Sequence, residues 1–181
     1  MEEIRHQVAI AGSVTDAITQ QRIADVGVEV VEQNLQIQTR EDGSFYFIDL
    51  PDGQYTLKVS APNLGSRYGT ATVANITVKN ENGRPIFDLQ ANVKLSPTRL
   101  VGQVKRSDNN QPIANALVQL CGSETQTLTN KEGRYVLSGI QASQPRVQVS
   151  VNGFVTQIQQ VKEKLIAGQE QPVDFRLVPS N

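Results

Sequence analysis

One sequence pattern occurs twice in this chain, at an offset of 90 residues. The first copy reads TREDGSFYFIDLPDGQYTLKV over residues 39–59, and the second reads TNKEGRYVLSGIQASQPRVQV over residues 129–149. The offset holds without a gap from Ile10 to Ser60, which a chance similarity rarely sustains. The repeat predicts two copies of one structural module. We place their boundary at the short junction Ser96–Arg99, which gives domains 1–96 and 97–181.

Within each copy, apolar and polar residues alternate with the period of two that is typical of a half-buried β-strand. The predicted core positions are Phe45, Phe47, Tyr55 and Leu57 in the first copy and Tyr135, Leu137, Val147 and Val149 in the second. Turn residues separate these short strands, and no amphipathic helix exceeds two turns. The sequence therefore predicts an all-β protein, built as two tandem Greek-key antiparallel β-sandwiches of about seven strands each.

The two copies differ after their last shared strand. The first is predicted to end in a long strand whose inward residues are Phe87, Leu89, Ala91, Val93 and Leu95. The second copy is shorter and closes with Val173, Phe175 and Leu177 inward. A strand followed by a loop is predicted over residues 160–168, in preference to a short helix.

The repeated pattern consists of Gly-x-Val, a polar loop, an apolar segment, Thr-x-x-(Asp/Glu)-Gly-x-(Phe/Tyr), and a second turn and strand. It is carried by Gly12, Val14, Ile23, Val28, Thr39, Gly43, Phe45, Leu50 and Tyr55, and again by Gly102, Val104, Pro112, Ile113, Ala116, Val118, Thr129, Gly133, Tyr135 and Ile140. Over nearly the whole chain this resembles the carboxypeptidase regulatory-like domain, a transthyretin-like (prealbumin-like) sandwich. The resemblance implies an accessory or adhesive module without catalysis, often used in tandem. Two loops depart from the family pattern, at Gln21–Arg22 and at 141–144.

Enzymes on this fold or a related one use side chains that this sequence lacks. The chain has one histidine, His6, whereas the related hydrolases, iron dioxygenases and zinc carboxypeptidases need several catalytic or metal-binding side chains. Residues 41–43 and 108–110 lack the alternating oxygen ligands of a calcium loop and are explained as turns. Lys105 follows an inward valine and so points outward, which excludes a buried isopeptide bond on the first strand. We therefore predict no enzymatic activity, no cofactor and no metal site.

Charge and hydropathy limit the partners. Residues 1–96 carry eight basic and twelve acidic side chains, and residues 97–181 carry nine and six, so neither copy has the basic stripe of a nucleic-acid-binding protein. The difference favours head-to-tail contacts, or it reflects chance. No run of 18 apolar residues is present, and Glu2 and Glu3 stand where a signal peptide has basic residues. We expect a cytoplasmic protein with no membrane partner, and the single Cys121 agrees with a reducing compartment.

Our first hypothesis is a stiff tandem that acts as a structural or protein-interaction module of a larger assembly or a homo-oligomer. A specific form of it is an accessory or cap component of a phage-tail-like contractile apparatus. The contacts are predicted in the loops after the two equivalent first strands, residues 15–22 and 105–111. The contact residues are Thr15, Asp16, Arg22, Lys105, Arg106, Asp108 and Asn109.

The alternative hypothesis is a carbohydrate- or cell-envelope-binding module. Sugars stack on exposed aromatic rings, and the chain has no tryptophan. Tyr55 and Tyr135 are predicted inward, so Tyr46 and Tyr68 are the predicted sugar platform. The chain also contains 20 glutamines, many on predicted outward strand faces. Such neutral faces suit association between sheets, although a bias in composition explains them equally well.

Overall fold

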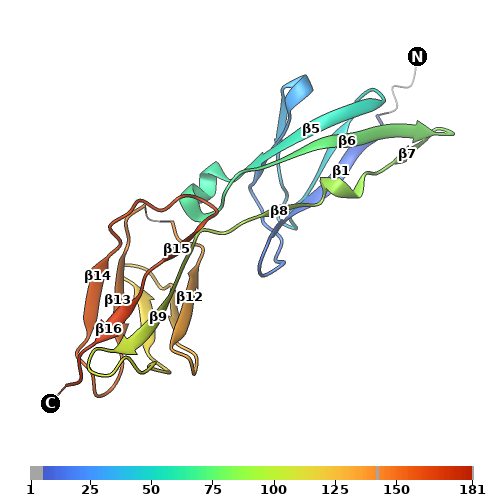
Figure 1. Cartoon of the computed structure of the whole chain (residues 1–181). Coiled ribbons are helices and arrows are strands. Elements are labelled where there is room, and N and C mark those ends of the chain that lie inside the picture. Colours follow the sequence, from blue (N-terminus) through green and yellow to red (C-terminus); the bar gives the residue numbers. More distant parts are fainter. Residues whose placement is uncertain (1–5, 142, 181) are drawn as a thin grey trace. The chain divides into compact units, whose positions relative to one another are not determined.

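In the computed structural model, which describes residues 6–141 and 143–180, the chain forms two compact units that meet between Ser96 and Pro97. Figure 1 shows that each unit is built from β-strands, and the short 3-10 helices assigned among the described residues belong to the first unit. The predicted all-β class is confirmed. The described residues form eight assigned strands in each unit, where the sequence predicted about seven.

The first unit is a sandwich of a three-stranded and a five-stranded sheet, ordered β4-β1-β8 and β3-β2-β5-β6-β7. The strands are β1 (Val8–Asp16), β2 (Gly27–Val30), β3 (Leu35–Gln38), β4 (Ser44–Ile48), β5 (Gly53–Ser60), β6 (Ala71–Glu81), β7 (Arg84–Ile86) and β8 (Val93–Leu95). The 3-10 helices are η1 (Val31–Gln33), η2 (Pro62–Arg67) and η3 (Leu89–Ala91).

The second unit repeats this plan with sheets ordered β12-β9-β15 and β11-β10-β13-β14, and β16 also pairs with β9. The strands are β9 (Arg99–Arg106), β10 (Leu117–Leu120), β11 (Gln126–Leu128), β12 (Arg134–Ser138), β13 (Arg146–Ser150), β14 (Gln157–Gln160), β15 (Glu170–Pro172) and β16 (Phe175–Leu177). β15 and β16 lie one after the other along β9, on either side of residues 173–174. Residues 160–168 hold the end of β14 and a loop, as predicted.

The pairing is not antiparallel throughout, which corrects one part of the prediction. In the first unit β8 runs parallel to β1, with Val14 opposite Val93. In the second unit β15 and β16 run parallel to β9, with Phe175 opposite Val104. The other strand pairs are antiparallel among the described residues. The last strands of each unit therefore return beside its first strand and run in the same direction.

Each unit has its own apolar core. The predicted core residues are all buried, at 6% exposure or less: Phe45, Phe47, Tyr55, Leu57, Tyr135, Leu137, Val147 and Val149. In the first core the rings of Phe45 and Phe47 meet edge to face, with centroids 6.2 Å apart. In the second core Tyr135 packs against Phe175 at the same centroid distance of 6.2 Å. The prediction from alternation is confirmed for these positions.

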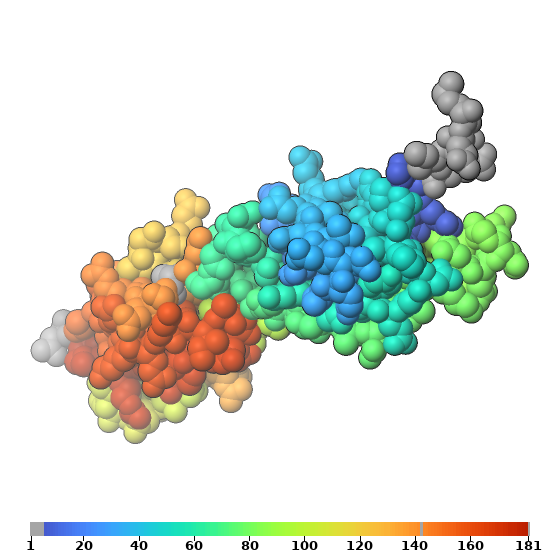
Figure 2. Space-filling view, turned by 90° about the horizontal axis from the view of Figure 1, so that it is seen from above, coloured from blue at the N-terminus to red at the C-terminus, as the bar shows by residue number. Residues whose placement is uncertain are grey.

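The predicted long strand over residues 87–95 is wrong in its first half. Asp88 accepts hydrogen bonds from the backbone N–H groups of Gln90 and Thr77, both at 2.9 Å, and so holds a turn that interrupts the strand. Phe87 and Leu89 are consequently 45% and 80% exposed instead of inward. Ala91, Val93 and Leu95 enter the core as predicted. Figure 2 shows the nearby tip of the β6–β7 hairpin (green) projecting from the body of the first unit.

The threonine of the repeated pattern ties two segments together below the surface. The Thr129 hydroxyl donates to the carbonyl of Ile113 at 2.7 Å and accepts from the N–H of Ala116 at 2.9 Å. Thr39 makes the equivalent pair of hydrogen bonds in the first unit, at 2.8 and 3.0 Å. Both threonines are almost fully buried. The hydroxyl satisfies backbone groups at the start of β10 and β2 that water cannot reach.

The glycine of the Gly-x-Val pattern is required by close packing. A β-carbon at position 102 would lie 1.9 Å from the carbonyl oxygen of Val173, and one at Gly12 would lie 2.2 Å from that of Ala91. These carbonyls belong to the segments that return beside the first strand. A side chain at either glycine would push the returning segment off the sandwich.

Candidate functional site

The first loop, residues 15–22, is held by Asp16 at its base. One carboxylate oxygen of Asp16 accepts from the N–H groups of Ile18 and Thr19, at 2.7 and 2.9 Å. The other accepts from the Tyr68 hydroxyl at 3.0 Å. Burial favours the neutral acid and would raise the pKa of Asp16, but these hydrogen bonds together hold its pKa below the usual value.

Asp16 is therefore not placed for the partner contact predicted from the sequence. It is only 5% exposed, because its carboxylate turns inward to cap the loop. Thr15 also belongs to β1 and is half-buried, paired with Arg22 in a bridge that closes the loop. Arg22 is exposed and donates to the backbone carbonyl of Asp42 at 3.3 Å. Ile18, which the sequence analysis did not single out, is the most prominent apolar side chain of the loop, at 55% exposure.

The second loop, residues 105–111, is held by a charge pair. Arg106 donates two hydrogen bonds to Asp108, at 2.9 and 2.7 Å, and these hold the pKa of Asp108 below its usual value. The side chain of Asn109 accepts from the N–H of Gln111 at 3.0 Å. Lys105 and Arg106 end β9 and are half-buried, whereas Asp108 and Asn109 are exposed. The four predicted contact residues therefore lie at the base and in the turn of one loop.

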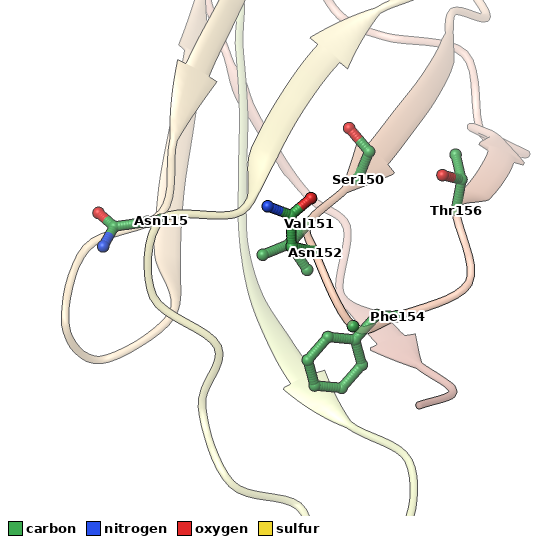
Figure 3. A pocket seen from close by; sticks show the side chains of 7 residues that line it. Asn115, Ser150, Val151, Asn152, Phe154 and Thr156 are labelled. Carbon is green, nitrogen blue, oxygen red and sulfur yellow. The ribbon is translucent and has the colours of Figure 1, made fainter. Parts of the chain in front are cut away.

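Beside this loop lies an open pocket of about 620 Å³, which the sequence analysis missed. It lies between β13 and β14 and is named here the β13–β14 pocket. Its lining residues are Asn115, Ser150, Val151, Asn152, Gly153, Phe154 and Thr156. In the view of Figure 3 the Phe154 ring lies below the side chains of Val151 and Asn152, with Thr156 on one side and Asn115 on the other.

The chain around the pocket is anchored to the last segment of the second unit. The N–H of Val155 donates to the carbonyl of Val178 at 2.8 Å, and the carbonyl of Gly153 accepts from Ser180 at 3.0 Å. A backbone bridge also joins Phe154 to Pro179. The turn between β13 and β14 is therefore held in one place by backbone hydrogen bonds.

Arg106 connects the second loop to the pocket. Its guanidinium lies over the ring of Phe154, with the carbon 5.4 Å from the ring centroid, a cation–π arrangement. Because Asp108 fixes the guanidinium, the loop positions the aromatic ring of the pocket. Two residues predicted as partner contacts thus support a site that the sequence did not reveal. The only local sequence signal near this pocket is the Asn152-Gly153 pair, which is typical of a turn.

The first unit has a different arrangement at the matching position. By the 90-residue offset, Asp16 is equivalent to Arg106. Asp16 binds the hydroxyl of Tyr68, whereas Arg106 lies over the ring of Phe154. Burial, the hydrogen bond to Asp16 and the charge of that carboxylate raise the pKa of Tyr68 to about 12. Tyr68 is half-buried against the first core, so it is not the exposed sugar platform that the sequence predicted.

Tyr46, the other predicted sugar platform, lies on β4 and is 42% exposed. The guanidinium of Arg40 covers one face of its ring at 4.5 Å from the centroid. Tyr46 lines a groove of about 320 Å³ together with Ile37 and Ile48. The structure therefore separates Tyr46 and Tyr68, which lie in different surroundings and do not form one platform.

Within residues 6–141 and 143–180, no three His, Cys, Asp or Glu side chains come together to hold a metal ion. In that same part of the chain, no helix is long and apolar enough to cross a membrane.

The solved structures to which this chain is similar share little sequence with it. A shaft pilin of Lactobacillus rhamnosus GG is 9% identical with a TM-score of 0.46, and the alignment covers 98% of each chain. The Bacillus anthracis TIE protein is 14% identical with a TM-score of 0.44, covering 95% of this chain and 34% of that one. A type II cohesin–X-dockerin complex from Acetivibrio cellulolyticus is 13% identical with a TM-score of 0.37, covering 45% of this chain and 56% of that one. In the last two cases the match spans about half or less of the other chain.

Comparison with curated proteins gave no match. A family model for the carboxypeptidase regulatory-like domain, in contrast, matches the chain twice, over residues 9–90 and 99–178. Each match falls within one of the two units. The resemblance read from the repeated pattern is confirmed, and the chain belongs to the carboxypeptidase regulatory-like domain family.

Proposed function

We propose that this chain is a non-enzymatic structural module that attaches to a larger protein assembly through its first and second loops. The observation that carries the proposal is that both loops are fixed by their own hydrogen bonds while their outer side chains stay exposed. Asp16 caps the first loop, and the Arg106–Asp108 pair holds the second. A loop that is already ordered loses little conformational entropy when a partner binds, so more of the contact energy appears as affinity.

The first loop supplies an apolar contact. Ile18 stands out at its tip, 55% exposed, and is surrounded by exposed polar residues. An apolar side chain on a rigid, polar-rimmed loop has the character of a binding hot spot. Arg22 at the base of the loop adds a charged group at its rim.

The uneven charge of the two units supports docking on charged partner surfaces. The first unit has four more acidic than basic side chains, and the second has three more basic than acidic ones. Opposite charges on a partner, or on another copy of this chain in a homo-oligomer, would speed and orient association. Raising the salt from about 50 to about 500 mM should therefore weaken the complex, because exposed charges are then screened within a few ångströms.

A specific form of the proposal places the chain in the cytoplasm as an accessory or cap component of a phage-tail-like contractile apparatus. Its support is the use of this family as tandem accessory modules, as the family resemblance implies. Native mass spectrometry of complexes purified with the tagged chain tests it. A stoichiometric tube, sheath or baseplate protein is the expected partner. Recovery of the chain alone as a monomer would contradict attachment to any assembly.

The loop assignment is tested by point variants in the full chain. Ile18→Ser should weaken partner binding severalfold and leave the melting temperature nearly unchanged, since the side chain is exposed. Ile166→Ser is the matched control, because Ile166 is similarly exposed at 62% and lies outside both loops. Replacing each loop by a short glycine-containing turn extends the test. Normal binding by both loop replacements would show that the contact lies on strand faces or edges.

A further inference from the structure

We infer that the β13–β14 pocket of the second unit binds a neutral saccharide. This goes beyond the proposed protein contacts, which involve the two loops. The inference rests on the chemistry of the lining side chains, on the supported aromatic ring, and on a pocket that is already formed.

The polar part of the lining suits hydroxyl groups. Asn115, Asn152, Ser150 and Thr156 each offer both a hydrogen-bond donor and an acceptor. Sugar hydroxyls also donate and accept, so one such side chain can bind a hydroxyl in either role. Among the described residues, none of these four side chains makes a hydrogen bond to another residue that would occupy it. They are free to turn toward a ligand.

The charge of the lining favours a neutral ligand. All seven lining residues are uncharged. An anionic ligand would be matched by arginine or lysine, and a metal ion by carboxylates. Arg106, which lies over the Phe154 ring, is already paired with Asp108.

The aromatic ring provides the apolar surface on which the C–H face of a sugar packs. Phe154 is half-buried: it packs against the second core and also lines the pocket. Its position is set by the bridge to Pro179 and by the guanidinium of Arg106. Val151 extends the apolar part of the lining. The pocket thus combines an apolar floor with polar groups around it, as ligand sites generally do.

The size and rigidity of the pocket agree with a small saccharide. Its volume of about 620 Å³ lies within the usual range of about 300–1,000 Å³ for ligand sites. The backbone hydrogen bonds of Val155 and Gly153 hold the turn in its place. Binding therefore requires little reordering of the chain. Because the pocket is open, a longer glycan can continue beyond it.

The first unit provides a natural comparison. After β5, the strand equivalent to β13, its chain forms the 3-10 helix η2 where the second unit has the open turn. Leu64 and Tyr68 pack against the first core, as Val151 and Phe154 pack against the second. The Tyr68 hydroxyl is bound to Asp16. We therefore expect saccharide binding by the second unit and not at the matching position of the first.

The test is an NMR titration of the full chain with maltotriose, cellotriose and chitotriose as neutral probes and sialyllactose as an acidic one. At least one neutral probe should cause saturable shifts of the backbone amides of Asn115, Asn152 and Gly153 at millimolar concentrations. Phe154→Ala and Asn152→Ala should each weaken this binding by about tenfold or more, equal to about 1.4 kcal/mol. Phe87→Ala, which removes an exposed ring of the first unit, is the matched control and should leave it unchanged.

Asn152→Ala keeps the test decisive if Phe154→Ala alters the turn, because Asn152 is exposed and its loss does not disturb the core. The inference is overturned if no neutral probe shifts the pocket amides. It is also overturned if only sialyllactose does so, or if the shifts map to Tyr46 or survive in the Asn152→Ala variant. None of these outcomes affects the loop contacts, which the Ile18→Ser variant tests separately.

Discussion

Replacing the buried hydroxyl of Thr129 with a methyl group should destabilise the second unit by about 3 kcal/mol. In Thr129→Val the N–H of Ala116 loses its acceptor at 2.9 Å, and the carbonyl of Ile113 loses its donor at 2.7 Å. Each buried group left without a partner costs about 1–3 kcal/mol. The added methyl returns about 0.8 kcal/mol of apolar burial. The net loss therefore lies between about 1 and 5 kcal/mol.

The assay is urea denaturation of the full chain, followed by circular dichroism. Thr129→Ser is the matched control, since it keeps the hydroxyl and loses only a methyl group, at a cost of about 1 kcal/mol. Thr39→Val makes the same change in the first unit and identifies which unfolding transition belongs to which unit. If Thr129→Val proved as stable as Thr129→Ser, the hydroxyl would not be holding these backbone groups, and the explanation of the repeated threonine would fall.

Three further predictions follow from the packing and the buried polar pair. Gly102→Ala should destabilise the second unit by about 3 kcal/mol or more in thermal melts, because the new β-carbon would lie 1.9 Å from the Val173 carbonyl oxygen. Gly53→Ala is the control and should be tolerated, since its β-carbon would have no neighbour nearer than 3.7 Å. Phe47→Ala should cost about 3–5 kcal/mol, enough to unfold a small unit, and a cooperative transition of normal stability in denaturant would contradict it. In ultraviolet titrations Tyr68 should ionise near pH 12, and Asp16→Asn should lower that pKa by removing the neighbouring charge. Because the pKa of Tyr68 is higher in the folded than in the unfolded chain, its protonated hydroxyl contributes fully to the stability of the first unit below about pH 10. That contribution should be lost as the pH rises through about 12. An unchanged Tyr68 pKa in the Asp16→Asn variant would refute the pairing.

The core could be predicted from sequence because alternation is a local property of a strand. Phe45 and Phe47 are separated by one residue, so they must share a face, and the repeat placed Tyr135 and Leu137 in the same way. The family resemblance succeeded for a related reason. Its glycines and threonine serve backbone geometry and buried backbone groups that every copy of the module shares.

The failures came where side chains far apart in sequence decide the structure. The alternation of residues 87–95 continues through Asp88, but the hydrogen bond from Thr77 to that carboxylate ends the strand there. Asp16 and Tyr68 look like surface residues until the fold joins them across 52 positions. The β13–β14 pocket likewise needs Asn115 to meet the turn at 150–156, which no local pattern in either segment reveals.

The parallel return of each unit's last strand has a mechanical consequence. In the second unit the chain enters at the start of β9 and leaves at the end of β16, which lies beside β9 and runs in the same direction. A force pulling these two ends apart would slide the strands along each other and load their hydrogen bonds together instead of opening them one at a time. The resistance of a domain to forced unfolding depends on its unfolding rate, and so on the energy barrier to breaking these hydrogen bonds together, and not on its equilibrium stability. In both units, tension applied between the first and last strands would therefore load these parallel pairs in shear.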